Sequence, residues 1–304
     1  MENEDMKMLF VYNPKSGKGK IRNHLVDIID VFIAAGYEVT VHSTQFHGDA
    51  VDIVKNREKG RYDMIVCSGG DGTLDEVVTG MIESGENIPI GYIPAGSTND
   101  FAKSLEISSD MLEAAKDIVN GKPFVCDVGE FNGKTFVYVM AFGLFTEVSY
   151  ATDQALKNLI GHAAYLLEGA KSLASIKAYR MKIESEERVV GGDFIYGMIS
   201  NSTSVGGFKN LAVKDVEFND GKFEVVLIKK PNSLTELSET VQALLQQSFD
   251  SPCIQSFKTD RITIYSDSEF NVTLDGEFGG THTEAVIENV QNAITIMVKD
   301  KENK

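Results

Sequence analysis

Short apolar runs alternate, over roughly the first 120 positions, with stretches in which apolar residues recur every three or four positions. The first pattern is typical of buried strands and the second of amphipathic helices. Predicted strands cover 8–12, 37–42, the run ending at 68, and 88–93; predicted helices cover 21–35, 49–59, 73–83 and 111–119. This alternation with short connections implies a parallel sheet covered by helices on both faces.

Polar, turn-forming loops follow the predicted strands of this sheet. They lie at 13–20, 43–44, 69–73 and 96–100, each directly after an apolar run. The carboxyl ends of parallel strands meet at one edge of a sheet, and ligands bind in the crevice outside them. Four converging polar loops therefore predict a nucleotide or phosphate site at this edge.

The loop at 69–73 reads Gly-Gly-Asp-Gly-Thr and opens a helical pattern. Glycines adopt backbone conformations that strain other residues, and they let a ligand approach peptide N–H groups. A helix that begins there directs its positive dipole end at the same point, which favours phosphate. Asp71 adds a carboxylate suited to a metal-bound or hydroxyl-bearing ligand. Lys15, Lys18 and Lys20 of the first loop could neutralise phosphate or could be solvated loop charge.

Two familiar nucleotide motifs are missing from the chain. No GxxxxGK[ST] occurs, which excludes a P-loop NTPase, and no GxGxxG follows the first strand.

The second half of the chain has a different pattern, dominated by β runs and turn formers. The predicted strands are 134–142, 177–183, 189–200, 222–229, 261–265 and 271–274. Helical spacing occurs at 152–176 and 234–247, and a last apolar run at 293–298 is expected to return to the first domain. Repeated β segments separated by turns predict a sandwich or barrel-like second domain.

Asp275-Gly276-Glu277 places two carboxylates across a glycine at the end of a predicted strand. Both side chains could face one cleft, and they would suit proton removal from an attacking hydroxyl with a metal held nearby. A surface hairpin turn is the alternative interpretation.

Composition narrows the class of protein. The chain has 304 residues, is 42% apolar and carries a net charge of −16, which argues against a nucleic-acid partner. The chain has three cysteines, Cys67, Cys126 and Cys253, and none has CxxC spacing, which argues against a zinc site and a disulfide framework. Three scattered thiols fit a reducing cytoplasm. The acidic N-terminus is not a signal peptide, and no apolar run approaches the roughly 18 residues of a membrane span.

Four motifs occur in a fixed order: Asn13-Pro14-x-Ser16-Gly17, Gly69-Gly70-Asp71-Gly72-Thr73, Gly96-Ser97-Thr98-Asn99-Asp100-Phe101-Ala102 and Leu274-Asp275-Gly276-Glu277. Together they resemble the diacylglycerol kinase catalytic family, especially its soluble bacterial lipid kinases, over nearly the whole chain. Sphingosine kinases and NAD kinases share the glycine-aspartate loop. The first and last motifs favour the lipid kinases.

The resemblance implies an NAD-kinase-like α/β nucleotide-binding domain followed by a β-sandwich, with the active site in the interdomain cleft. The first domain would span 1–130, completed by 288–304, and the lipid-substrate domain would span 131–287. The implied reaction is phosphorylation of the diacylglycerol hydroxyl by ATP, with Mg²⁺, to give phosphatidic acid.

The resemblance also implies roles for individual residues. Glu277 matches the catalytic base, with Asp275 beside it, and Asp71, Asp100 and Asp127 match an aspartate network that supports magnesium. A structural magnesium would match Asp220 with backbone oxygens of Glu217 and Lys222. The implied ATP contacts are Asn13, Pro14, Lys15, Ser16, Gly17, Thr44, Gly70, Asp71, Gly72, Thr73, Leu74, Asp75, Glu76 and Ser97.

The chain departs from the family pattern at two positions. Asp75 stands where the family usually has Asn, and its extra charge would repel phosphate unless magnesium or a lysine compensates. Ser97 stands in the family's Gly-Thr-x-Asn-Asp motif and keeps the hydroxyl.

A lipid kinase without a membrane span must meet its substrate at the membrane surface. The segment 151–182 is apolar at helical spacing and carries five Lys or Arg against two acids, which predicts a membrane-facing surface or a helix packed on the β domain. The expected location is the cytoplasm, with transient contact at the inner membrane face, and a homodimer fits the resemblance.

Three alternatives stay open at this point. The acceptor could be phosphatidylglycerol or a sphingoid base, the enzyme could be NAD kinase-like with a soluble acceptor, or the chain could be a non-enzymatic nucleotide-binding regulator.

Overall fold

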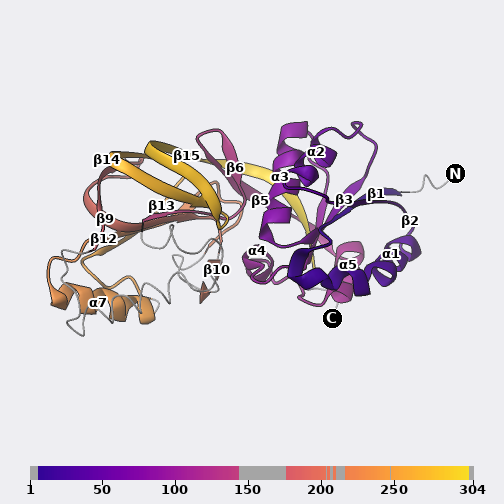
Figure 1. Ribbon diagram of the computed structural model, residues 1–304, viewed down its shortest axis with the longest axis horizontal. Helices are drawn as coiled ribbons and strands as arrows, with labels where there is room; N and C mark the ends of the chain where they lie inside the picture. Colours follow the sequence, from indigo (N-terminus) through magenta and orange to yellow (C-terminus); the bar gives the residue numbers. More distant parts are fainter. Residues whose placement is uncertain are drawn as a thin grey trace. The chain divides into compact units, whose positions relative to one another are not determined.

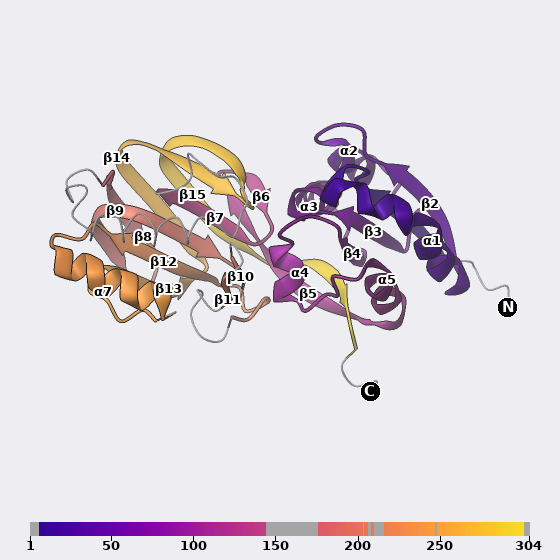
Figure 2. The ribbon, with the colours of Figure 1, turned by 60° about the horizontal axis from the view of Figure 1, so that its bottom comes forward.

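The computed structural model describes residues 6–143, 176–202, 204–205, 208–209, 216–246 and 248–300. The chain divides into two compact units, Met1–Asp127 with Asn292–Lys304, and Val128–Gln291. Figures 1 and 2 show their elements. The predicted helix at 152–176 lies, except for its last residue, outside the described residues.

The first unit is built on a parallel sheet. Its strands are β1 (Met6–Tyr12), β2 (Tyr37–Ser43), β3 (Met64–Gly69) and β4 (Ile90–Pro94). They lie in the order β4-β3-β1-β2, and every neighbouring pair is parallel. The long strand β15 (Glu277–Val298) joins the sheet near its end, where Ile296 pairs in parallel with Ile90 of β4. All four polar loops therefore leave the same edge of one sheet.

Helices cover both faces of this sheet. They are η1 (Ser16–Asn23), α1 (Leu25–Ala34), α2 (Asp49–Lys55), α3 (Asp71–Ser84), α4 (Asp100–Ser104) and α5 (Met111–Asn120). The helices α1 and α5 contact each other on one face, and α2 and α3 pair on the other (Figures 1 and 2). Alternate residues of β1, Met8 and Phe10, point into the core under α1 and α5, as the period of a strand requires.

The predicted helix at 21–35 is wrong in its first part. Ile21 lies in the 3₁₀ segment η1, and the α-helix begins only at Leu25. Three successive residues, Gly17, Lys18 and Gly19, have positive φ angles, which breaks any helix that would start in this loop. In contrast, α3 begins at Asp71, two positions before the predicted start, so the glycine loop runs directly into a helix.

The second unit is an antiparallel β structure. Its strands are β5 (Lys122–Phe131, shared with the first unit), β6 (Lys134–Phe136), β7 (Val139–Gly143), β8 (Tyr179–Glu184), β9 (Val189–Ser200), β12 (Phe223–Lys229), β13 (Ile254–Thr259) and β14 (Arg261–Leu274), with the first part of β15. A ribbon of β10 (Ser204–Val205) and β11 (Phe208–Lys209) and the helix α7 (Leu234–Leu245) complete the described elements.

Two long strands of this unit change partners along their length. The first half of β9 pairs with β8 and the second half with β7. The strand β14 does the same, pairing with β8 around Ile264 and with β7 around Thr273. Such strands fold a sheet over itself, and the enclosed core is rich in aromatic side chains, among them Phe136, Phe142 and Phe223.

Some strand predictions for this unit are confirmed and others need correction. The run 189–200 coincides with β9. The run 134–142 is two strands, β6 and β7, and the runs 261–265 and 271–274 are both parts of β14. The strands β5 and β13 were not predicted. In β13 only Ile254 and Phe257 are buried apolar residues, so its pattern is too weak to stand out from its polar neighbours.

Two basic residues of the predicted basic segment lie beside acids. Arg180 Nη1 lies 3.5 Å from Asp193, and Lys182 lies beside Glu184 on the same strand. The other basic residues of the segment, except Lys177, lie outside the described residues. The membrane-facing surface predicted at 151–182 therefore stays a prediction.

Candidate active site

Asn13 connects the loop after β1 to the loop after β3. Its backbone N–H donates to Ser68 O at 2.8 Å, and its side-chain amide donates to Thr73 Oγ1 at 3.2 Å. Its Oδ1 accepts the backbone N–H of Lys15 at 3.0 Å. One side chain thus fixes the start of two of the predicted ATP-contacting segments.

Glycines let three loops touch through their backbones. A Cβ added to Gly96 would lie 2.6 Å from Gly70 Cα, which is closer than real Cβ contacts allow. A Cβ on Gly17 would clash with the carbonyl oxygen of Ala95, and the φ angle of Gly17 is +54°. The three loops therefore meet through glycine backbone, with Ser16 Oγ and Asn99 Oδ1 beside Gly70 and Gly96.

A short polar network holds the third of these loops in place. Asn99, which has a φ angle of +51°, accepts the N–H of Gly96 at 2.9 Å and donates to its carbonyl at 3.0 Å. The predicted contact Ser97 lies within this closed turn. Tyr92 is fully buried and its hydroxyl donates to Gly69 O at 3.3 Å. Burial and the nearby charge of Asp71 raise the pKa of Tyr92 well above its ordinary value, so it remains a neutral donor.

The helix α3 begins at the glycine loop and contributes its N-terminal dipole. Thr73 and Leu74 donate their N–H groups to Gly70 O at 3.0 and 3.2 Å, so the helical turn closes immediately after the loop. A 14-residue helix aimed at a glycine-lined edge favours a bound phosphate there. The Leu74 side chain is buried in the core, which leaves only its backbone for a nucleotide contact.

Glu76 is held by backbone rather than left open at the site. Its carboxylate accepts N–H groups from Gly48 at 2.8 Å and Ala50 at 3.2 Å, and His47 Nδ1 lies 2.9 Å away. These contacts order the start of α2, close to Thr44, whose own N–H donates to Tyr12 O. Glu76 therefore positions the loop beside Thr44, and the direct ATP contact predicted for it stays a prediction.

The aspartate network predicted at Asp71, Asp100 and Asp127 stays a prediction, and the structure shows one hydrogen bond within it. Asp71 Oδ2 accepts the N–H of Asp100 at 3.2 Å, whereas the buried Asp127 accepts the N–H of Asn292 at 2.7 Å. Within the described residues, no three His, Cys, Asp or Glu side chains form a group that could hold a metal ion. Asp71 and Asp100 still fit the usual magnesium arrangement, in which one or two carboxylates act together with nucleotide phosphates.

Asp275 has a structural role that the sequence did not reveal. Its carboxylate accepts three backbone N–H groups, from Val137 at 2.5 Å, Tyr138 at 3.0 Å and Val139 at 2.9 Å. It is 4% exposed, and its φ angle of +49° with that of Gly276 at +87° makes the two-residue turn between β14 and β15. These contacts hold the turn in place, and the catalytic role predicted for Asp275 stays a prediction.

Glu277 is the first residue of β15, directly after this turn, and it is exposed. Its partner in the ladder is Leu274, and its carboxylate has no hydrogen bond or ion pair with any residue in the described ranges. An exposed, unpaired carboxylate on a rigid hairpin can accept a proton from a substrate hydroxyl.

The predicted magnesium ligand Asp220 is engaged by protein groups. Its Oδ1 accepts the N–H of Lys222 at 2.9 Å, and its Oδ2 lies 3.1 Å from Lys258 Nζ. Lys258 also lies 3.2 Å from Oε1 of the buried Glu224. The Asp220 carboxylate therefore already faces a cation, the Lys258 ammonium. The structural magnesium predicted at Asp220, Glu217 and Lys222 stays a prediction.

We expect Glu224→Gln to stabilise the protein at pH 8 and to have little effect at pH 5. Burial, opposed by Lys258, raises the pKa of Glu224 from 4.5 to about 7. The native state then binds more protons than the unfolded state between these values, so the free energy of unfolding falls as pH rises through this window. The Gln side chain cannot ionise, so the variant avoids this decrease in the free energy of unfolding, which is at most about 3 kcal/mol.

Urea unfolding at both pH values, with the exposed Glu239→Gln as control, would measure the effect. Equal stabilisation at pH 5 and pH 8 would contradict the assignment.

The first unit is a parallel α/β unit with glycine-lined loops before the N-terminus of α3, as in proteins that bind nucleotides. The second unit is an antiparallel β unit that carries the exposed Glu277. Residues 7–131 match the family model described as diacylglycerol kinase catalytic domain. Residues 139–298 match the YegS C-terminal NAD kinase beta sandwich-like domain. The chain belongs to the diacylglycerol kinase catalytic-domain family.

Relatives and solved structures agree with this assignment. The chain is 33% identical over 292 residues to a diacylglycerol kinase of Bacillus subtilis (strain 168), covering 96% of each chain. It is 34% identical over 271 residues to a diacylglycerol kinase of Staphylococcus haemolyticus, covering 89% of this chain and 82% of that one. A crystal structure of a Bacillus anthracis str. Sterne protein matches with a TM-score of 0.79 at 26% identity, covering 96% of this chain and 95% of that one.

The family resemblance and the fold class predicted from the sequence are confirmed by these matches. The catalytic-domain match identifies a kinase of lipid metabolism and implies the use of ATP. None of the helices in the described part of the chain is long and apolar enough to span a membrane.

Proposed function

We propose that the protein transfers the γ-phosphoryl group of ATP to the free hydroxyl of diacylglycerol, producing phosphatidic acid. The observation that carries this proposal is the backbone contact of the loops at Gly17, Gly70 and Gly96 in front of the N-terminus of α3. That edge suits a polyphosphate. The curated relatives of similar length carry the name diacylglycerol kinase, which supports the choice of acceptor.

The triphosphate would bind against the peptide N–H groups of these loops. Lys15 and Lys18 lie in the first loop and supply positive charge to a protein whose overall charge is −16. Asp71 and Asp100 are the residues that would hold a magnesium ion, which supplies charge to the phosphate oxygens when bound. Phosphoryl transfer depends mainly on such positioning and on electrostatic stabilisation.

Glu277 would act as the general base. Its carboxylate accepts the proton of the lipid hydroxyl while the hydroxyl oxygen forms a bond to the γ-phosphorus. The bond between the γ-phosphorus and the bridging oxygen breaks, and ADP leaves with that electron pair. The Asp275 carboxylate, fixed by its three amide donors, keeps the turn that carries Glu277 in one conformation.

The lipid would be met at the cytoplasmic face of a membrane. All three cysteines are free and buried, which fits a reducing compartment.

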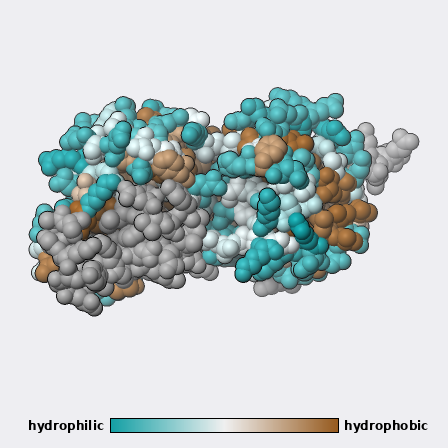
Figure 3. Space-filling view, in the orientation of Figure 1, coloured by the Kyte–Doolittle hydropathy of each residue, from teal (hydrophilic) through white to brown (hydrophobic). Residues whose placement is uncertain are grey.

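A homodimer has an apolar face available in the first unit, where Val26 and Ile33 of α1 are 70% and 56% exposed and Val41 lies on the edge strand β2. Figure 3 shows hydrophobic surface at this end of the unit. We propose that the kinase acts at the cytoplasmic membrane face and forms a homodimer.

Transfer of labelled γ-phosphate from ATP and magnesium to a panel of acceptors tests the function. Diacylglycerol, phosphatidylglycerol and sphingosine would be presented in mixed micelles, with NAD as a soluble acceptor. We expect labelled phosphatidic acid. Label on another lipid would change the substrate, and label on NAD alone would indicate an NAD kinase-like enzyme. Bound ATP without any labelled product would indicate a nucleotide-binding regulator.

A further inference from the structure

The loop between β2 and α2 exposes an aromatic ring at the polar edge of the parallel sheet. Phe46 is 63% exposed, more than any other aromatic side chain that the structure describes. It lies two positions after Thr44, a predicted ATP contact, and outside the four family motifs. The fold gains little from a ring in this position, because most of its surface stays in water.

Two carboxylates hold the backbone on either side of Phe46. Asp49 Oδ2 accepts the N–H of Gln45 at 2.7 Å, and the N–H of Asp49 donates to Phe46 O at 3.4 Å. On the other side, Glu76 of α3 accepts the N–H of Gly48 at 2.8 Å. The loop is therefore fixed at both ends, and the exposed ring is carried by an ordered backbone.

Backbone contacts align this loop with the loops after β1 and β3. The N–H of Thr44 donates to Tyr12 O at 2.9 Å, and the N–H of Asn13 donates to Ser68 O at 2.8 Å. The strands lie in the order β3-β1-β2, and a spacing of about 4.8 Å puts the end of β2 roughly 10 Å from the end of β3. A nucleotide whose phosphates lie at the glycine loop after β3 carries its base beyond a ribose, a separation of the same size.

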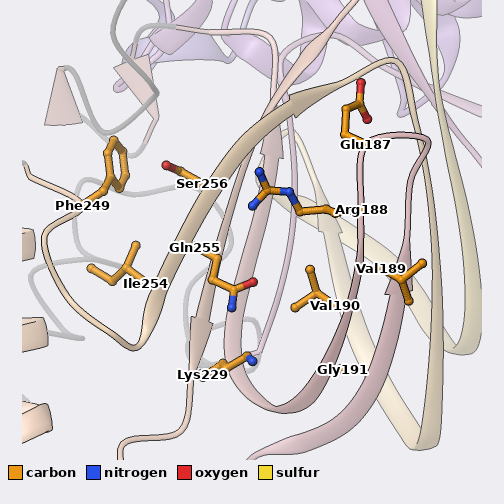
Figure 4. A pocket seen from close by; sticks show the side chains of 10 residues that line it. All are labelled: Glu187, Arg188, Val189, Val190, Gly191, Lys229, Phe249, Ile254, Gln255 and Ser256. Carbon is orange, nitrogen blue, oxygen red and sulfur yellow. The ribbon is translucent and has the colours of Figure 1, made fainter.

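The faces of the Phe46 ring are uncovered. Among the described residues, it has no contact with a second ring or with a cation. Rings of the second unit differ: the guanidinium carbon of Arg188 lies 4.7 Å from the ring centroid of Phe257. Lys229 Nζ lies 5.8 Å from that of Phe194, and Figure 4 shows both cations among the side chains that line a depression. The open ring of Phe46 can accept a flat aromatic group instead.

Charge decides which part of a nucleotide suits this loop. The carboxylates of Asp49 and Glu76 flank it, and they disfavour a phosphate group there. The glycine loops and the N-terminus of α3 favour the phosphates. The neutral base is the part of ATP that the loop after β2 can accept.

We propose that Phe46 is the platform for the base of ATP, which stacks on its ring while the triphosphate lies against the glycine loops. This inference rests on the proposed function, since it needs a nucleotide at this edge. Stacking on an aromatic side chain tolerates different bases, because every base has a π-face. Phe46 therefore sets the affinity for a nucleoside triphosphate over a free triphosphate.

A single tryptophan tests the position of the base. The chain has no tryptophan, so Phe46→Trp introduces one fluorescent reporter. We expect ATP with magnesium to quench its emission, excited where the nucleotide does not absorb, and inorganic tripolyphosphate to leave it unchanged. Tyr265→Trp, on β14 of the second unit and 41% exposed, is the control and should respond to neither ligand.

Isothermal titration calorimetry of Phe46→Leu tests the energetic role of the ring. Leucine keeps an apolar side chain and removes the π-face. We expect ATP to bind about tenfold more weakly, within the range for one base stacked on an aromatic side chain. The affinity for tripolyphosphate should be unchanged, and Phe46→Tyr should bind ATP like the unmodified protein.

The other outcomes separate this inference from the proposed function. Unchanged ATP affinity in Phe46→Leu would overturn the platform and leave the nucleotide site in place. An equal loss of ATP and tripolyphosphate affinity would show a disturbed loop rather than a lost stacking contact. Quenching of Phe46→Trp by vesicles of anionic phospholipid, with no response to ATP, would make the ring a membrane contact. An unmodified protein that binds neither ATP nor tripolyphosphate would remove the proposed function, and this inference with it.

Discussion

Glu277→Gln should lower the rate of phosphoryl transfer by about 10²- to 10⁴-fold, the contribution typical of a general base. The amide has nearly the same shape but cannot accept the hydroxyl proton. Glu277 is exposed and the described structure gives it no partner to lose, so the fold and the ATP affinity should be unchanged. Initial rates with diacylglycerol and an independent ATP-binding titration would separate the two effects.

Glu284→Gln is the matched control for this variant. Glu284 lies on the same strand β15 and is also exposed. It should retain full activity. Near-normal turnover in Glu277→Gln would show that another group accepts the proton, while the family assignment would stand.

Asp275→Asn should destabilise the second unit by about 2–4 kcal/mol, because a neutral amide replaces a carboxylate that accepts three buried N–H groups. Asn tolerates the positive φ angle at this position, so the change isolates the hydrogen bonds from backbone strain. Hydrogen exchange of the amides at 137–139 should become faster. Turnover should fall as well, since Glu277 lies two residues further along the same turn.

Asp267→Asn, an exposed change on the same strand β14, controls for the loss of one negative charge. Unchanged exchange at 137–139 in Asp275→Asn would mean that these amides do not depend on the carboxylate. Asp275 would then return to consideration as a catalytic group.

The parallel sheet, and the edge from which its polar loops leave, could be predicted from the sequence because local patterns encode them. Apolar runs that end in glycine and asparagine mark both a strand and the loop that follows it, and β9 coincides with its predicted range for the same reason. The helix at 21–35 was predicted too long because Ile21 is buried at helical spacing although it lies in η1. Apolar spacing alone does not distinguish these two kinds of turn.

The role of Asp275 could not be predicted, because its three partners lie 136 to 138 positions earlier in the chain. A carboxylate beside a candidate base suggests chemistry, and only the folded hairpin shows that its oxygens are occupied. The engagement of Glu76 with Gly48 and Ala50 is hidden in the same way. Motifs therefore identify the residues of a site, but they do not show which of these residues contact a ligand and which hold the loops in place.

The path of β15 has a consequence for how the protein is made. Residues 277–288 of this strand pair with β14 in the second unit, and Ile296 pairs with β4 in the first. The buried Asp127 also accepts the N–H of Asn292, which is synthesised near the end of the described chain. A ribosome therefore completes the first half of the chain long before that half can close its sheet. Until the last strand emerges, the strand β4 presents an open edge, and the nucleotide-binding unit matures last although it is synthesised first.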